Sequence, residues 1–246
     1  MVEERNTIYL CLAHMSEAGL EQKYVKEAFD TNWVVPMGPN VNAFEQSLSD
    51  FANTNSDGSK LDHRVVCLSA GTAAVHLALI ACGVKSGDEV CVQSFTFCAS
   101  SHPITYLGAK PVFIDSERET WNMDPELLEK AIIERKTVTG KYPKAIIPVA
   151  LYGMPYDCER IMAIADKYGI SVIEDAAEGM GARFNGQVLG TFGRFGVLSF
   201  NGNKMITTSG GGALICKDAE SKNQIMWYAT QAREAYPYYQ HEAIGD

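Results

Sequence analysis

The chain has 246 residues, 46% of them hydrophobic, and a formal net charge of −9. A chain of this size can bury one large core or two small ones. The acidic balance argues against a general nucleic-acid binder, which carries a basic face, and against adhesion to an anionic membrane surface.

From residue 64 onward, short apolar runs alternate with segments of helical pattern. The apolar runs predict strands at 64–69, 88–93, 110–115, 144–150, 170–175, 195–201 and 212–217. The helical patterns lie at 71–83, at 96–108 with an interruption near Pro103, at 124–136, at 157–169 and at about 218–235. This alternation predicts an α/β fold with a mainly parallel seven-stranded sheet flanked by helices.

Local signals mark several boundaries of these elements. Asp124 followed by Pro125 predicts a helix start, and Gly169 predicts a helix end. Asn185-Gly186 predicts a tight hairpin within 183–190.

The cysteines and the N-terminus bear on location. Seven cysteines without a CxxC motif indicate reduced thiols and a cytoplasmic protein. No apolar run approaches the roughly 20 residues that span a bilayer, and the polar start MVEERNTIYL is not typical of a signal peptide. No ligand cluster predicts a metal site.

The candidate site residues follow the strands, because ligands of parallel α/β sheets lie beyond the carboxyl ends of the strands. Gly71 and Thr72 open a helix, where free N–H groups and the helix dipole favour a phosphate. The alternative is an ordinary helix start with a small residue for packing. Asp175 ends an apolar strand. Its carboxylate could be a helix cap or the partner of a buried cation such as a protonated pyridine nitrogen.

Two further residues complete the candidate site. Phe97 is a ring that could lie against a planar ligand, or a core phenylalanine. Lys204 lies between a predicted strand and a glycine loop. It could be a lysine that forms a Schiff base or an ordinary surface lysine. Together these residues predict one ligand with a phosphate, a flat ring, a basic ring nitrogen and an aldehyde, which is pyridoxal 5′-phosphate (PLP).

Several longer stretches resemble the DegT–StrS sugar aminotransferases, PLP enzymes of the aspartate-aminotransferase fold. They are VVPMGPNVNAFE (34–45), SAGTAAVHLAL (69–79), GDEVCVQSFTFCAS (87–100), ALYGMPYD (150–157), VIEDAAEGMGA (172–182) and GTFGRFGVLSFNGNKMITTSGGGAL (190–214). The last two blocks place Asp175 and Lys204 29 residues apart and are the most specific.

The resemblance implies a role for each matching position. Lys204 would bind PLP covalently and later move a proton, and Asp175 would pair with the pyridine nitrogen. Phe97 would stack on the ring, and Glu178 falls where the family often has Gln, His or Glu near the ring. The positions that would hold the phosphate are Gly71, Thr72 and Ser199.

The same resemblance implies the reaction and the assembly. An amino donor, commonly glutamate, would supply the amine, and a nucleotide-linked keto-sugar would receive it for amino-sugar or surface-glycan synthesis. The enzyme would be a homodimer with shared active sites. Lys204 argues against the dehydratase branch of the family, in which histidine replaces the lysine.

The end of the chain departs from the family pattern. Relatives continue beyond HEAIGD (241–246) into a small C-terminal domain. The resemblance therefore implies that residues 1–246 form the PLP-binding large domain, that the small domain is missing, and that segment 1–35 packs on that domain in full-length relatives.

Two alternatives to an active aminotransferase remain open. One is a truncated PLP-binding remnant without turnover. The other is a nicotinamide-dependent Rossmann oxidoreductase, which fits the α/β pattern but lacks a G-x-G-x-x-G after the first strand and gives Lys204 no role.

Overall fold

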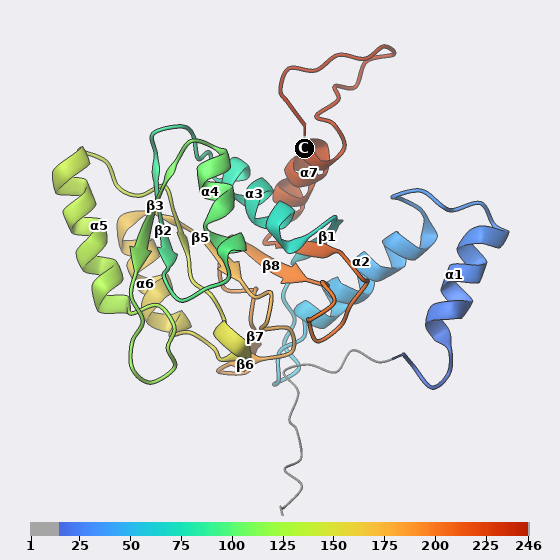
Figure 1. Ribbon diagram of the computed structural model, residues 1–246, viewed down its shortest axis with the longest axis horizontal. Helices are drawn as coiled ribbons and strands as arrows, with labels where there is room; N and C mark the ends of the chain where they lie inside the picture. The colour runs from blue at the N-terminus through green and yellow to red at the C-terminus, as the bar shows by residue number, and fades with distance from the viewer. Residues whose placement is uncertain (1–14, 246) are drawn as a thin grey trace, which may run out of the picture.

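A seven-stranded sheet forms the centre of the computed structural model, which describes residues 15–245 (Figure 1). Across the sheet the strands are β1 (Arg64–Leu68), β9 (Gly212–Cys216), β8 (Phe195–Ser199), β5 (Ser171–Asp175), β4 (Ala145–Ile147), β2 (Glu89–Gln93) and β3 (Lys110–Ile114). The five strands from β8 to β3 pair in parallel, whereas β9 is antiparallel to both β1 and β8. The predicted mainly parallel seven-stranded sheet is confirmed.

Helices cover both faces of this sheet. One face packs against α3 (Gly71–Ala81), α4 (His102–Tyr106) and α7 (Ala219–Ala229), and the other against α2 (Pro39–Ala52), α5 (Pro125–Thr139) and α6 (Cys158–Tyr168). Successive strand residues point to opposite faces, so Val172 joins the core under α6 and Ile173 joins the core under α3. The last two residues of β5, Glu174 and Asp175, are therefore directed to opposite sides of the sheet.

The residues predicted to start a helix, end a helix and form a hairpin turn do so in the structure. Asp124 accepts hydrogen bonds from the first turn of α5, at the N–H groups of Glu126 and Leu127. Gly169 follows α6 with a φ of 65°, in the left-handed region that favours glycine. The Asn185-Gly186 turn joins β6 (Arg183–Phe184) to β7 (Gln187–Val188) as a small hairpin.

Three predicted elements are shorter than expected. The segment 96–108 contains a 3-10 turn, η1 (Cys98–Ser100), before α4, because Pro103 has to lie in the first turn of a new helix. The strand predicted at 144–150 ends at Ile147, apart from an isolated bridge at Val149. The last helix ends at Ala229 instead of near 235, since Gln231 and Ala232 both have positive φ.

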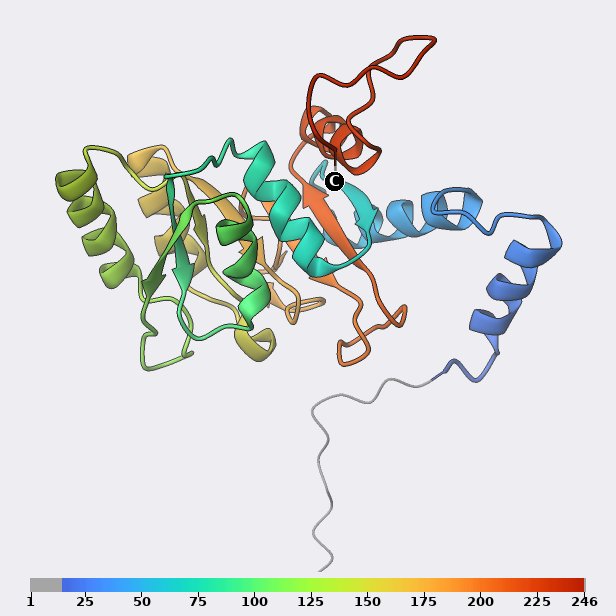
Figure 2. The same cartoon turned by 45° about the horizontal axis from the view of Figure 1, so that its top comes forward.

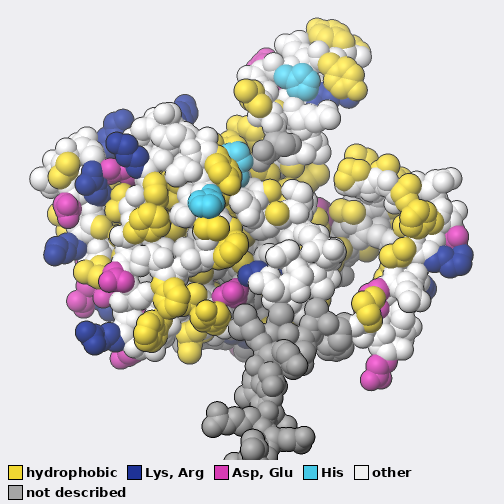
Figure 3. Space-filling view, viewed as in Figure 1, with side chains coloured by type: hydrophobic (Ala, Val, Ile, Leu, Met, Phe, Trp, Pro, Cys, Tyr) yellow, Lys and Arg dark blue, Asp and Glu magenta, His cyan; other side chains and the backbone are white. Residues whose placement is uncertain are grey.

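The N-terminal part has two helices that the periodicity argument did not place. Helix α1 (Leu20–Asp30) has no buried residue and stands away from the sheet (Figures 1 and 2). Hydrophobic side chains are exposed over α1 and the segment that joins it to α2 (Figure 3); they include Tyr24, Val25, Phe29, Trp33 and Val34. The packing expected for segment 1–35 on a small domain stays a prediction, and residues 1–14 lie outside the described part.

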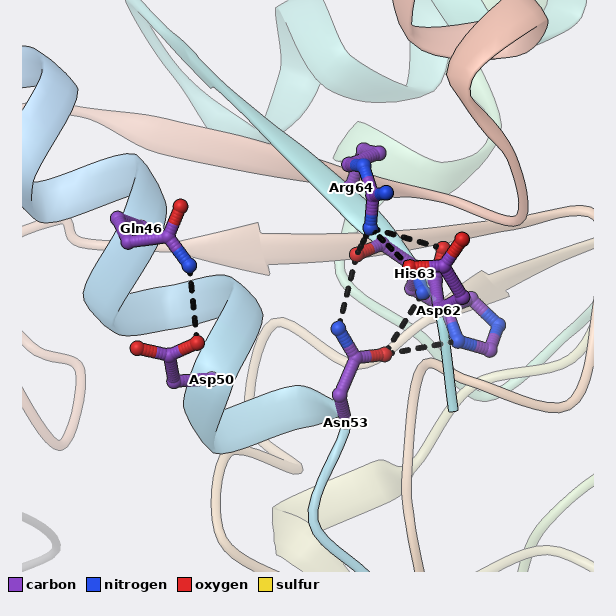
Figure 4. A network of polar contacts seen from close by, with 6 residues as sticks. All are labelled: Gln46, Asp50, Asn53, Asp62, His63 and Arg64. Atoms are coloured by element: carbon purple, nitrogen blue, oxygen red, sulfur yellow. Dashed lines mark hydrogen bonds and ion pairs between the residues drawn. The ribbon is translucent and has the colours of Figure 1, made fainter. Parts of the chain in front are cut away.

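Helix α2 is fixed to β1 by polar contacts. The Asn53 side chain donates to the His63 carbonyl at 2.9 Å and accepts from the His63 N–H at 2.7 Å (Figure 4). The Glu45 carboxylate accepts from the Cys67 N–H at 2.9 Å and pairs with Lys222 of α7 at 3.0 Å. These contacts attach α2 beside the strand that leads to α3.

Candidate functional site

A cavity of about 570 Å³ lies at the carboxyl ends of β1, β2, β5 and β8. Its wall contains all seven residues singled out from the sequence, namely Gly71, Thr72, Phe97, Asp175, Glu178, Ser199 and Lys204. Segments more than 100 residues apart in the chain thus meet at one edge of the sheet. The convergence expected for a parallel sheet is present, and the pocket has the size of a site for a cofactor or small molecule.

Asp175 lies at the floor of the cavity and is only 7% exposed. Its Oδ2 accepts a hydrogen bond from the Ser100 hydroxyl at 2.5 Å, and its Oδ1 accepts from the Ala177 N–H at 3.1 Å. Burial raises the pKa of the Asp175 carboxyl, while these two hydrogen bonds and the charge of Lys204 oppose the rise. The Ala177 contact is cap-like, but the carboxylate also faces the cavity, where a cation could pair with it.

Lys204 is a partly buried residue of the cavity wall and not an exposed surface lysine. Its side chain is 13% exposed, and its Nζ lies 3.5 Å from Oε1 of Glu178. The other carboxylate oxygen of Glu178 accepts a hydrogen bond from the Tyr152 N–H at 2.7 Å. Glu178 is therefore held in place by the loop after β4 and compensates the charge of Lys204.

The start of α3 forms an uncapped helix N-terminus beside Ser199. Ala70 provides no side-chain cap, so the first-turn N–H groups of α3 are available to an anion. A Cβ at Gly71 would lie 3.1 Å from the Ser199 Cβ and 3.4 Å from its Oγ, which shows how closely β8 approaches this turn. Gly71, Thr72 and Ser199 thus form a cradle suited to a phosphate.

Phe97 lies at the rim of the cavity and is 74% exposed. The alternative of a core phenylalanine is therefore wrong. Phe95 also lines the cavity, and its ring packs edge-to-face against Trp121 with ring centroids 6.0 Å apart. An open aromatic surface borders the cavity.

Sequence reasoning missed the polar residues that hold the cavity wall. Gln93 is fully buried, and its Oε1 accepts from the N–H groups of Met123 and Val149. Asn122 accepts from the Leu151 N–H at 3.1 Å and donates to the Met154 carbonyl at 3.0 Å. A polar residue ending an otherwise apolar strand, as Gln93 does, was the available signal.

Ser100 was missed as well, because nothing in the run SFTFCASS distinguishes it from its neighbours. Only the fold brings it to Asp175, 75 residues further along the chain.

Two features are absent from residues 15–245. No group of three or more His, Cys, Asp or Glu in this part is arranged to hold a metal ion. None of its helices combines the length and the apolar character that crossing a membrane requires.

Comparisons with known proteins show which proteins this chain is similar to. The protein named "Putative pyridoxal phosphate-dependent aminotransferase EpsN" from Bacillus subtilis (strain 168) is 49% identical over 238 residues, which cover 97% of this chain and 58% of the relative. GDP-perosamine synthase of Escherichia coli O157:H7 is 37% identical, with 96% of this chain and 61% of the relative covered. The chain thus spans about three fifths of the length of these relatives.

A solved structure shares the fold. The crystal structure of a DegT DnrJ EryC1 StrS aminotransferase from Brucella abortus matches with a TM-score of 0.80 and 30% identity, over 94% of this chain and 62% of that one. The family model for the DegT/DnrJ/EryC1/StrS aminotransferase family matches residues 16–246. Because that match spans almost all of the sequence, this chain belongs to the DegT/DnrJ/EryC1/StrS aminotransferase family.

Proposed function

We propose that this protein uses PLP to transfer an amino group, with glutamate as the donor and a nucleotide-linked keto-sugar as the acceptor. The observation that carries the proposal is the shared cavity, whose wall contains a partly buried lysine, a buried carboxylate and an uncapped helix N-terminus. Family membership supports the same reaction class.

The residues in the cavity fit PLP. Lys204 supplies the amine for an aldehyde, and Asp175 supplies a buried carboxylate for a protonated ring nitrogen. Gly71, Thr72 and Ser199 supply donors for a phosphate. Phe97 supplies an aromatic face at the rim, available to a flat ring. Each part of the cofactor has a partner of matching chemistry at the strand ends that line the cavity.

When bound, PLP supplies an electron-poor ring that stabilises negative charge on the substrate carbon. The protein's own contribution is to orient groups and move a proton. Lys204 Nζ, once free, is the base that carries a proton between substrate atoms, and Glu178 at 3.5 Å keeps it directed into the cavity. Asp175 stays in place through Ser100 and Ala177 and keeps a ring nitrogen charged.

The names of relatives bear on the acceptor, and the exposed side chains at the cavity mouth bear on the assembly. Relatives include GDP-perosamine synthase and a UDP-2-acetamido-2-deoxy-3-oxo-D-glucuronate aminotransferase of Pseudomonas aeruginosa, and these names support a nucleotide-linked sugar for this chain. The exposed rings of Phe97 and Tyr152 in the cavity wall, and of Trp121 beside the wall residue Phe95, support a second copy covering the cavity mouth. The free cysteines support a cytoplasmic protein.

Absorption spectroscopy with added PLP and glutamate tests the proposal. We expect the wild type to bind PLP with a visible band, and glutamate to convert that band to the pyridoxamine phosphate spectrum. In Lys204→Ala the rate of this conversion should fall by about 10²–10⁴-fold. The exposed control Lys217→Ala should convert at the wild-type rate. PLP binding without any conversion would instead support the non-catalytic alternative, and a chain that ignores PLP would contradict the proposal.

A further inference from the structure

Two hydroxyl groups connect the cavity surface to the buried carboxylate of Asp175. Ser100 closes η1 and is fully buried, and its Oγ lies 2.5 Å from Asp175 Oδ2. Thr96, in the loop after β2, lines the cavity, and its Oγ1 lies 2.7 Å from the Ser100 Oγ. The three side chains therefore form a continuous hydrogen-bonded chain.

The protons of this chain have one consistent arrangement when Asp175 is ionised. A carboxylate can only accept, so the Ser100 hydroxyl must donate its single proton to Asp175. Ser100 can then only accept from Thr96, which must donate in turn. The Thr96 oxygen has only lone pairs left for the cavity, so any group that lies against it there has to be a donor.

The arrangement reverses when Asp175 is neutral. A protonated Asp175 can donate to Ser100, which then donates to Thr96, and the Thr96 proton becomes free to point into the cavity. The donor or acceptor character of Thr96 thus depends on the charge of a carboxyl group two hydroxyls away.

We propose that Ser100 and Thr96 are positioning residues, a relay that orients Asp175 and keeps it ionised. This role rests on the proposed function in so far as an ionised Asp175 pairs with a cofactor cation. Among the described residues, the charged groups that act on Asp175 are Lys204, which favours its ionised form, and Glu178, which opposes it. Ser100 holds Oδ2 and the Ala177 N–H holds Oδ1, so removing Ser100 releases one of the two oxygens.

The direct test is the pKa of Asp175 in the cofactor-free protein, followed by carbon NMR of its carboxyl group, with Asp175→Asn to assign the signal. Loss of a charge-assisted hydrogen bond in Ser100→Ala should lower the acid dissociation constant of Asp175 about tenfold or more. Ser100→Thr keeps the hydroxyl and should restore the wild-type value. Thr96→Val keeps the shape and should have a smaller effect of the same sign.

The matched control is Ser101→Ala, since the Ser101 hydroxyl donates to the Cys98 carbonyl and not to Asp175. Should Ser100→Ala fold poorly, Ser100→Cys, with similar volume and a weaker donor, gives an intermediate shift. Identical titration of Asp175 in the wild type and in the folded Ser100 variants would overturn the relay.

The PLP dissociation constant, measured on the same variants, separates this inference from the proposed function. A wild type that binds no PLP but shows the Ser100-dependent titration contradicts the function and supports the relay. A wild type that binds PLP while Asp175 ignores Ser100 contradicts the relay and leaves the function standing.

Discussion

Two carboxylates end strand β5, and their different surroundings give them different tasks. Asp175 faces the cavity, whereas Glu174 faces the opposite side of the sheet, where it is also buried. Oε1 of Glu174 accepts from the N–H groups of Phe192 and Gly193, and Oε2 accepts from the N–H of Gly190. Glu174 thus ties the loop before β8 to β5, a structural role that its neighbour does not share.

Glu174→Gln should destabilise the protein by about 1–3 kcal/mol, because an amide NH2 would replace an oxygen that accepts from a backbone N–H. Urea unfolding measures the loss. The exposed control Glu159→Gln on α6 should stay within about 0.5 kcal/mol of the wild type.

The pH dependence of that loss has a defined sign. Burial raises the pKa of the Glu174 carboxyl, so this group takes up protons on folding. Its contribution to wild-type stability is then present below the unfolded value of about 4.3 and declines as pH rises through the native pKa. The deficit of Glu174→Gln should therefore be larger near about pH 5 than near about pH 8; a deficit that grows with pH would contradict the raised pKa.

At the scale of elements, the backbone at the start of α3 lies in close contact with strand β9. Strand β9 passes so close to the Ala70–Gly71 turn that a Cβ at Gly212 would lie 2.4 Å from both the Ala70 carbonyl carbon and the Gly71 nitrogen. This close contact explains why the last residue of the glycine run 210–212, Gly212, has no side chain. Only glycine lets β9 and the proposed phosphate cradle pack together.

Gly212→Ala should lower the free energy of unfolding by about 1–3 kcal/mol, because backbone has to move to admit the methyl group. It should also weaken PLP binding, since the displaced segment carries Gly71. Thermal and urea unfolding, with a PLP titration alongside, measure both effects. Gly202→Ala is the matched control, as its Cβ would meet no atom within 4 Å; equal stability of the two variants would refute the packing argument.

The elements that the sequence predicted well are those with local signals or buried periodicity. Strand β8 is a mostly apolar run, and α5 begins with an N-cap and a proline. Helix α2 instead follows Gly38, which offers no capping side chain, and α1 buries no face, so neither had a strong signal. Ser100 reaches Asp175 only because the sheet order places β2 two strands from β5, which no local pattern encodes.

At the scale of the whole molecule, exposed hydrophobic side chains border the cavity. Phe97 and Tyr152 line it and are more than half exposed, and Trp121, also more than half exposed, packs against the ring of the wall residue Phe95. An exposed apolar surface around a cavity is typical of an interface that another chain covers. The proposed homodimer would place its contact there.

Light scattering of the wild type should therefore give the mass of a dimer. Trp121→Glu introduces a charge into the proposed contact and should shift the protein toward monomer. The control Ile133→Glu lies on the exposed side of α5 and should leave the dimer intact. A monomeric wild type, or equal behaviour of the two variants, would count against a contact at the cavity mouth.

The central claim is that Lys204 is the residue that binds PLP. Borohydride reduction of the PLP-treated protein, followed by peptide mass mapping, tests it most directly. The account predicts a single stable pyridoxyl adduct on Lys204, prevented by Lys204→Ala. An adduct spread over exposed lysines, or none at Lys204, would contradict the assignment of this cavity as the cofactor site.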